Sequence, residues 1–242
     1  MGRDFVKELQ KEKNVDEIWM IARRIVRLDV MAEKSNGRLR VLAFDLTDMG
    51  SFKYFEDFLT KEKPQILYLI NAAGAGRMGK VDEISYNDHA FVLDINVRAL
   101  TCMSRICLPY MGKGSHIILL CSGSAFLPQP EFASYAASKS YVLSFSRALR
   151  QEVKKEGISV TAVCPGPVNT EFFEAAGSEI APAKKRFLVE SKDVVRKAMK
   201  DAKSGKELSV YGISMKLVHL AGKMLPTRVV LSVMNEMMNK HE

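Results

Sequence analysis

Short apolar runs alternate with longer helical patterns along almost the whole chain. Each run has about the length of a buried strand, and most end at a polar residue, proline or glycine. The runs lie at residues 17–22, 40–44, 65–70, 116–121 and 158–163, with a further short one at 208–211. Strands that are buried on both faces and separated by helices form βαβ units. The sequence therefore predicts an α/β fold in which a doubly wound parallel sheet has helices on both faces.

Length and composition narrow the class of protein. A chain of 242 residues can bury a full core, and we predict a single domain over 1–242. No apolar run approaches the roughly 18 residues of a membrane span and no apolar signal core follows the N-terminus, which predicts a cytoplasmic protein. The four cysteines form no CxxC pair and the four histidines are scattered, so we predict reduced buried thiols and no metal site.

The net charge of +8 is compatible with nucleic acid, an anionic membrane surface or a phosphate-bearing small ligand as partner. The lysines and arginines are spread along the chain among acidic residues, which is typical of a solvated surface. Clustered basic residues with aromatic residues between them, as nucleic-acid binding needs, are lacking. We therefore predict a small-molecule ligand and no nucleic-acid partner.

Polar residues follow the apolar runs at the positions where parallel α/β sheets bind ligands. In such sheets the ligand lies beyond the carboxyl ends of the strands. The residues at these ends are Arg23, Asp45, Asn71, Ser122 and Pro165. We expect them to lie at one edge of the sheet and to form one site.

Tyr135 and Lys139 lie four residues apart in a helical pattern, so they share one face of the predicted helix. An ammonium one turn from a phenol favours the phenolate, and would lower the tyrosine pKa from about 10 toward neutral pH. The alternative is an ordinary exposed pair on a helix. Ser122, thirteen residues before the tyrosine, and Asn96, further upstream, favour a general acid/base site.

These motifs, in their order and spacing, resemble the short-chain dehydrogenase/reductase family from the first helix to about residue 170. The resemblance is carried by Asn71-Ala72-Ala73-Gly74, Asn96, Ser122, Tyr135-x-x-x-Lys139 and Pro165-Gly166-Pro167-Val168-Asn169-Thr170. It implies a Rossmann-like sheet and hydride transfer between a nicotinamide cofactor and a carbonyl compound or secondary alcohol.

The resemblance also implies four catalytic residues. Tyr135 would be the general acid/base, and Ser122 a second hydrogen-bond donor to the substrate oxygen. Lys139 would also hold the nicotinamide ribose, and Asn96 would kink its helix and order a water of the proton relay. Two plainer alternatives stay open: Ser122 could cap the end of its strand, and Asn96 could be an ordinary buried amide.

The same resemblance implies the cofactor contacts. Asn71 and Gly74 would steady the sheet and admit the cofactor, although Asn71 could be only a turn former. Ala72 stands where a second asparagine is commoner, and Pro165-Gly166 could be only a strand breaker. The predicted cofactor-binding residues are Arg23, Asp45, Asn71, Ala72, Gly74, Tyr135, Lys139, Pro165, Gly166, Val168 and Thr170.

The choice of cofactor depends on the end of the run at 17–22. In dinucleotide folds an acidic residue there binds the ribose 2′-hydroxyl, whereas arginine accommodates a 2′-phosphate. Ala22 takes the place of the acid and Arg23-Arg24 follow, so we predict NADP(H), with NAD(H) as the alternative cofactor. The two arginines could also simply be the first residues of a solvent-exposed helix. Asp45 could bind the adenine amino group, cap the next helix, or do both.

The substrate is predicted from the segment at about 171–190, which in the family is a lid over the pocket. Apolar residues there and in the loop after Ser122 suggest a lipid-like, steroid or aromatic carbonyl or alcohol. They are Phe126, Leu127, Phe132, Phe172, Phe173, Ile180 and Phe187. The tail at about 213–242 is predicted as two helices split at Pro226. It could be a subunit contact, a lid extension or a face for peripheral membrane contact. We predict a homodimer or homotetramer.

The front of the chain departs from the family pattern. Family members begin with a strand and a Thr-Gly-x-x-x-Gly-x-Gly turn, whose amides bind the pyrophosphate. Gly2 resembles the last glycine of that turn, so we expect the first strand and most of the turn to be missing. Either residues upstream of Met1 supply them, or this is a short form. A short form could be a non-catalytic binding or interaction protein.

Overall fold

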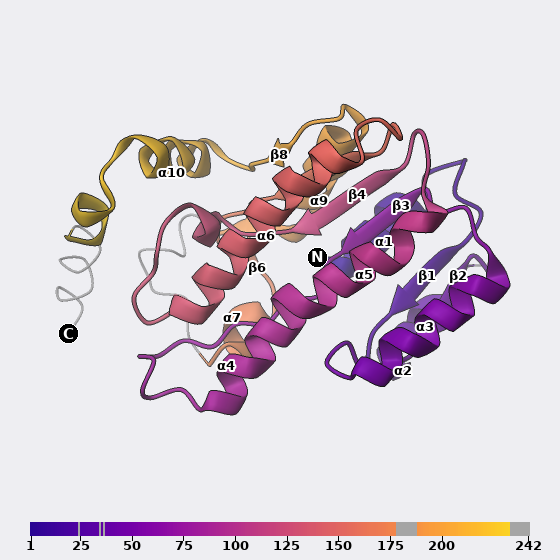
Figure 1. The fold of residues 1–242 in the computed structure, drawn as a ribbon, viewed down its shortest axis with the longest axis horizontal. Helices are drawn as coiled ribbons and strands as arrows, with labels where there is room; N and C mark the ends of the chain where they lie inside the picture. The colour runs from indigo at the N-terminus through magenta and orange to yellow at the C-terminus, as the bar shows by residue number, and fades with distance from the viewer. Residues whose placement is uncertain (24, 34, 36, 178–187, 233–242) are drawn as a thin grey trace.

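The computed structural model describes residues 1–23, 25–33, 35, 37–177 and 188–232 (Figure 1). Its main strands run parallel, as the alternation of strands and helices predicts. They are β1 (Ile18–Ile21), β2 (Leu39–Leu42), β3 (Tyr68–Asn71), β4 (His116–Leu120), β5 (Ser159–Val163) and β8 (Leu208–Ser209).

The strands form two groups. Among the described residues, β1 pairs with β2, and a second sheet has the order β3-β4-β5-β8. The sheet is divided between β1 and β3, which agrees with the first strand that the family resemblance led us to expect to be missing between these two strands. A cavity of about 2080 Å³ is lined by residues of both strands, including Ile18, Met20, Tyr68 and Ile70. It continues to the carboxyl ends of β3, β4 and β5.

Helices cover both faces of the strands, which confirms the predicted Rossmann-like α/β architecture. One face carries α3 (Met49–Glu62), α5 (Leu100–Cys107) and α6 (Ala133–Glu152). The other carries α1 (Gly2–Leu9), α2 (Ile25–Glu33) and α9 (Ser191–Lys203).

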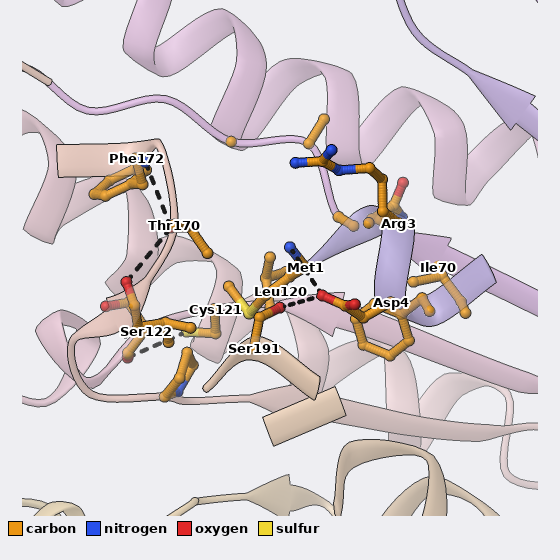
Figure 2. Close-up of a pocket in the computed structure, with 18 of the residues that line it drawn as sticks. Met1, Arg3, Asp4, Ile70, Leu120, Cys121, Ser122, Thr170, Phe172 and Ser191 are labelled. Atoms are coloured by element: carbon orange, nitrogen blue, oxygen red, sulfur yellow. Dashed lines mark hydrogen bonds and ion pairs between the residues drawn. The ribbon is translucent and has the colours of Figure 1, made fainter. Parts of the chain in front are cut away.

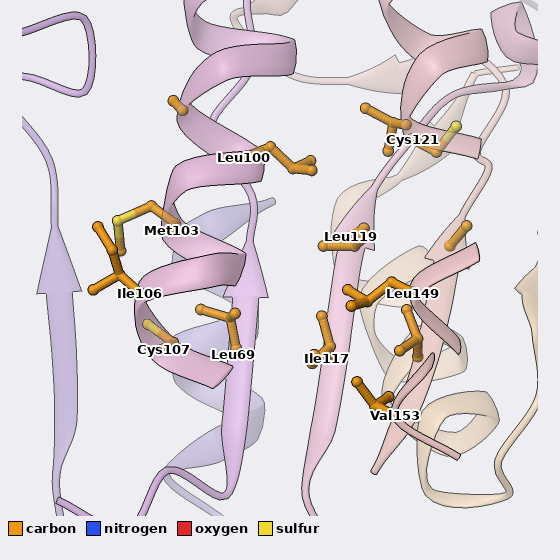
Figure 3. Close-up of a cluster of buried hydrophobic side chains, with 14 of the residues drawn as sticks. Leu69, Leu100, Met103, Ile106, Cys107, Ile117, Leu119, Cys121, Leu149 and Val153 are labelled. Atoms are coloured by element: carbon orange, nitrogen blue, oxygen red, sulfur yellow. The ribbon is translucent and has the colours of Figure 1, made fainter. Parts of the chain in front are cut away.

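Alternate residues of β4 pack against the two helical layers, because successive side chains of a strand point to opposite faces. Ile117 and Leu119 contact the cluster that includes α5 and α6 (Figure 3). Ile118 and Leu120 belong to the cluster that includes α1 and α9. Ile117, Ile118 and Leu119 are fully buried, so β4 is the centre of the core and fixes the position of the residues that follow it.

Residues 86–110, where the sequence pattern predicts a helix, form four consecutive helical segments, the last of which is the 3₁₀ turn Leu108–Tyr110. α4 (Tyr86–Leu93) leads into a π-helical segment, Asp94–Ala99, and then into α5. π-helical turns inside α-helices are frequent at functional sites. The π-helical segment contains Asn96, for which the resemblance implies a kinked helix.

Shorter elements follow β5. They are β6 (Val168–Asn169), α7 (Phe172–Ala175), β7 (Val189–Glu190) and α10 (Ile213–Met224). β6 pairs with β7. The lid residues Ile180 and Phe187 and the tail beyond Ser232 lie outside the described residues.

Two helix N-termini differ from what their sequences suggest: Asp45 could cap α3, and a serine at the start of a helical pattern, such as Ser191, is typical of an N-cap. The N-cap of α3 is Asp48, whose carboxylate accepts hydrogen bonds from Gly50 N and Ser51 N, so Asp45 is not the cap. Ser191 is the first residue of α9 and not its N-cap. Its hydroxyl donates instead to the Asp4 carboxylate of α1 at 2.6 Å, which joins the two helices.

Candidate active site

Tyr135 lies at the start of α6, in the wall of the large cavity. Its ring stacks on Phe132, with 4.3 Å between ring centroids, and contacts Phe172 of α7 at 5.2 Å. The side chain is 7% exposed. An aromatic pocket therefore holds the phenol, and only a small part of the residue reaches the cavity.

Ser122 follows β4 directly and lies beside the tyrosine. Its hydroxyl accepts a hydrogen bond from Ser124 N at 3.1 Å and so caps the 3₁₀ turn Gly123–Phe126. The Ser122 side chain is also close enough to the Tyr135 hydroxyl to act on the tyrosine pKa. The capping bond is compatible with the predicted role, because it fixes the serine next to the tyrosine.

Lys139 shares the helix face of Tyr135, as the spacing predicts. Its Nζ lies 5.6 Å from the centroid of the tyrosine ring and donates to the Leu120 carbonyl at 2.8 Å. The residue is 3% exposed. The ammonium is thus held against the end of β4.

The pKa of Tyr135 differs from the sequence expectation. Burial raises this pKa above its ordinary value, although hydrogen bonding with Ser122 works in the opposite direction. Burial also lowers the pKa of Lys139, to about 8. The sequence led us to expect that Lys139, four residues away, would lower the Tyr135 pKa. Burial of both side chains away from water has the larger effect, so the Tyr135 pKa is raised instead.

Asn96 holds the loop after β3. Its side-chain oxygen accepts from Ala75 N at 2.9 Å, and its amide donates to Ala75 O at 2.8 Å and to Ser138 Oγ at 2.9 Å. Ser138 in turn donates to the Tyr135 carbonyl at 2.7 Å. Asn96 is 1% exposed, so its amide is buried as well as hydrogen-bonded. This amide connects the glycine loop with the helix of the tyrosine.

Gly74 lies where no side chain fits without displacing this network. A Cβ at this position would lie 3.3 Å from Asn96 Oδ1 and 3.5 Å from Lys139 Nζ. Asn71, at the end of β3, donates to Ser104 Oγ of α5 at 3.2 Å. Ala72 follows it and lines the cavity. The loop therefore brings backbone, not side chains, close to Lys139.

The segment after β5 faces the same cavity. Gly123 N donates to the Pro165 carbonyl at 2.8 Å, which joins the ends of β4 and β5. Thr170 Oγ1 accepts from Phe172 N at 3.4 Å, and Figure 2 shows Ser122, Thr170 and Phe172 around the pocket. Val168 and Gly166 also line it.

Arg23 lies at the far end of the cavity, after β1. Its guanidinium is 3.7 Å from the Asp45 carboxylate and 5.5 Å from the centroid of the Phe91 ring. Burial favours the neutral form of Asp45, but hydrogen bonds from Thr47 and the nearby Arg23 leave the Asp45 pKa below its ordinary value. Arg24 lies outside the described residues.

The predicted site residues form one surface. All of them except Asp45 and Asn96 line the same cavity, which runs from Arg23 to Tyr135. The cavity includes the carboxyl ends of β1, β3, β4 and β5 and the N-terminal end of α1, where Met1 and Arg3 lie (Figure 2). A helix N-terminus, glycine backbone and an arginine are the groups that bind a phosphate-bearing dinucleotide. The residues present therefore fit a nicotinamide dinucleotide.

Met215 of α10 is a site residue that the sequence reasoning missed. A Cβ on Gly166 would lie 2.9 Å from Met215 Cγ and Sδ, and a Cβ on Gly123 would collide with Met215 Cε. The methionine therefore covers the two glycines next to Ser122 and Pro165. Spacing gave no signal for this contact, because it joins residues about 50 and 90 positions apart in the sequence.

Two buried thiols also lie at this site. Cys121 and Cys164 directly follow β4 and β5, and each thiol influences the pKa of the other. Cys121 Sγ donates to the Lys139 carbonyl at 3.2 Å. Both residues are free and buried, as the sequence predicts for these thiols.

Comparison with known proteins agrees with this geometry. The family model described as short chain dehydrogenase matches residues 1–181. An uncharacterized oxidoreductase of Staphylococcus epidermidis is 26% identical over 187 residues, which cover 76% of this chain and 80% of that protein.

Solved structures share the fold. A short-chain dehydrogenase from Sphingobium yanoikuyae in complex with NADPH superposes with a TM-score of 0.79 at 23% identity, covering 96% of this chain and 91% of that one. A short chain dehydrogenase/reductase from Burkholderia phymatum in complex with NAD has a TM-score of 0.78 at 20% identity, covering 92% and 89%. With the family match over residues 1–181, these findings show that the chain belongs to the short-chain dehydrogenase/reductase family of oxidoreductases.

Proposed function

We propose that this protein transfers a hydride between NADP(H) and the carbonyl or secondary alcohol of a largely apolar small molecule, with Tyr135 as general acid/base. One observation carries the proposal. The hydroxyls of Tyr135 and Ser122 lie together in the wall of a cavity that also holds Lys139 and the glycine-containing loops. This is the set of donors that a carbonyl needs when it gains a hydride.

The chemistry follows from the charge that develops on the substrate oxygen. The bound nicotinamide would supply or accept the hydride. As a carbonyl is reduced, its oxygen becomes negative, and the hydroxyls of Ser122 and Tyr135 would donate to it. The raised pKa of Tyr135 keeps the phenol protonated near neutral pH, so it can deliver the proton.

Lys139 and Asn96 would position these groups. The Lys139 ammonium lies next to Gly74 and would donate to hydroxyls of the cofactor ribose. Asn96 holds Ala75 and, through Ser138, the backbone of Tyr135. The predicted water relay through Asn96 remains part of the proposal.

The preference for NADP(H) is proposed from Arg23. Solved neighbours contain NADPH in one case and NAD in another, so relatives use both cofactors. In this chain Arg23 follows Ala22, and no acidic residue takes the place of the ribose ligand. The Arg23 side chain is 54% exposed and pairs with Asp45, an exposed ion pair of small energy that a phosphate can replace.

An apolar substrate is proposed from the lining near Tyr135. Phe132, Phe172, Leu127 and Met215 line the cavity on this side. Aromatic and thioether side chains bury apolar surface and offer no charged partner to a polar substrate. A homodimeric or homotetrameric assembly and a cytoplasmic location remain predictions.

The direct test is a cofactor oxidation assay. The protein is mixed with NADPH or NADH and a panel of aliphatic, aromatic and steroid ketones, and the loss of absorbance of the reduced nicotinamide is followed. We expect turnover with NADPH and an apolar ketone, with slower turnover of short polar carbonyls. NADPH binding by fluorescence titration without turnover of any ketone or alcohol would favour the alternative, a non-catalytic binding protein.

A further inference from the structure

The helix α10 has two faces of different kinds. Its inner face packs on the site: Met215 contacts Gly123 and Gly166, and the His219 ring lies 4.3 Å from the Phe126 ring. Gly222 belongs to the same face, and a Cβ there would lie 2.7 Å from the Phe126 carbonyl. The inner face thus fixes the orientation of the helix, and its opposite face points away from the site.

The outer face is apolar and exposed. Residues at spacings of four, three and four lie on one side of a helix. Ile213, Leu217, Leu220 and Met224 have this spacing and are 78%, 61%, 52% and 73% exposed. The stripe continues past the helix with Leu225 and Val229, at 48% and 47%. Exposed apolar side chains gathered in this way mark an interaction surface more often than scattered ones do.

The charges beside this stripe have one sign. Lys216 and Lys223 directly precede Leu217 and Met224, so both lie along one border of the apolar stripe. Arg228 follows, and all three basic residues are exposed. Between Ile213 and Ser232 the sequence has no aspartate or glutamate.

From this arrangement we propose that the outer face of α10 docks the protein on the surface of an anionic lipid membrane. A helix with an apolar stripe and basic flanks lies in the membrane interface, with the apolar side chains among the acyl chains and the lysines at the headgroups. The net charge of +8 adds long-range attraction. No helix in the described part of the chain could span a bilayer, so the contact is peripheral.

Charge is also the reason for preferring lipid to a second copy of the chain. A two-fold contact through this face would bring Lys216, Lys223 and Arg228 of both copies together. The segment supplies no acidic side chain to pair with them. Anionic headgroups supply that partner.

The inner face of α10 connects the proposed membrane contact with the candidate active site. Ser214, Met215 and Val218 line the cavity, so the helix that contacts lipid also forms part of the cavity wall. An apolar substrate could then reach the site from the bilayer. This consequence rests on the proposed function, whereas the docking itself does not.

The test is vesicle co-sedimentation of the whole protein and its variants. Vesicles of phosphatidylcholine are compared with vesicles of equal parts phosphatidylcholine and phosphatidylglycerol. We expect binding to the anionic vesicles that weakens as salt increases, with at least tenfold weaker binding to pure phosphatidylcholine. Leu217→Gln/Leu220→Gln and Lys216→Gln/Lys223→Gln should each reduce the binding to anionic vesicles at least tenfold.

Matched controls exclude a general effect of surface polarity or charge. Val26→Gln/Val30→Gln changes two exposed apolar residues on α2, and Lys53→Gln/Lys61→Gln changes two exposed lysines on α3. Both should bind vesicles as the parent does. Circular dichroism checks that each variant is folded.

Two results would overturn the proposal. One is equal vesicle binding by the parent and the α10 variants. The other is a parent protein that does not bind anionic vesicles and is a dimer in analytical ultracentrifugation, while the Leu217→Gln/Leu220→Gln variant is a monomer. The second result would assign the face to a second copy of the chain. This test does not measure NADPH turnover. A failure of the docking proposal can therefore be distinguished from a failure of the proposed function.

Discussion

The Nζ of Lys139 donates a 2.8 Å hydrogen bond to the carbonyl of Leu120, which ties the helix of Tyr135 to the end of the central strand β4. The ammonium is buried at this place, and the burial lowers the pKa of Lys139 from 10.5 to about 8. Because the folded pKa is below the unfolded one, the unfolded state binds more protons between these two values. The contribution of Lys139 therefore disfavours folding below pH 8, and this penalty is relieved as the pH rises from about 8 to 10.5.

Lys139→Met should remove this pH dependence. At pH 7 the methionine avoids the desolvation of an ammonium, an effect of about 3 kcal/mol at most, and the lost hydrogen bond offsets part of it. The measurement is the free energy of unfolding in urea at several pH values from 7 to 10. We expect the difference between variant and parent to shift in favour of the parent above pH 8. A difference that stays constant over this range would show that Lys139 has its ordinary pKa.

Gly74→Ala should loosen the loop that we propose to contact the cofactor. The added methyl lies 3.3 Å from Asn96 Oδ1, so the amide must move and its bonds to Ala75 weaken. We expect a loss of stability of about 1–2 kcal/mol and weaker NADPH binding. Gly112→Ala is the control, because nothing lies within 4 Å of its Cβ, and it should be neutral or slightly stabilising. Equal effects of the two substitutions would contradict the close contact.

Asn96→Ala should lower the free energy of unfolding far more than Asn71→Ala does. The first removes three hydrogen bonds of a buried amide and leaves Ala75 N and O without that partner, at about 3 kcal/mol. The second removes one bond, to Ser104, at about 1 kcal/mol. Urea unfolding of both variants checks the order. A smaller loss for Asn96→Ala than for Asn71→Ala would refute the structural role given to Asn96.

Arg23→Asp should change the choice of cofactor. In the proposed binding mode the substitution removes a charge-assisted contact with the 2′-phosphate and places a repelling carboxylate there, so NADPH binding should weaken by about 2–3 kcal/mol while NADH binding changes little. Fluorescence titration with both cofactors measures this. Arg105→Asp, at an exposed ion pair with Glu56, is the charge-matched control. If Arg23→Asp weakened both cofactors equally, Arg23 would not read the phosphate.

The parts of the fold that depend on local pattern could be predicted from the sequence. The run Ile117-Ile118-Leu119-Leu120 predicts a strand buried on both faces, and β4 has this position. The strand ends then bring Ser122 and Pro165 to one edge, as parallel strands must. The order and spacing of the motifs were enough to identify the family.

Properties that depend on three-dimensional neighbours could not be predicted. The direction of the Tyr135 pKa shift follows from the burial of the phenol, to which the rings of Phe132 and Phe172 contribute. Asp48, and not Asp45, caps α3, because both are acidic residues before a helix and only the turn geometry distinguishes them. The two faces of α10 became distinct only with Met215 placed on the glycines of the site.

The central claim is that the Tyr135 hydroxyl passes the proton during hydride transfer. The most direct measurement compares the parent with Tyr135→Phe in NADPH-dependent reduction of an apolar ketone, with NADPH affinity measured on the same samples. Since phenylalanine keeps the stacking on Phe132 and Phe172 and loses only the hydroxyl, the account predicts that turnover is abolished while cofactor affinity and stability stay near those of the parent. Ketone reduction by Tyr135→Phe within about tenfold of the parent rate would contradict it.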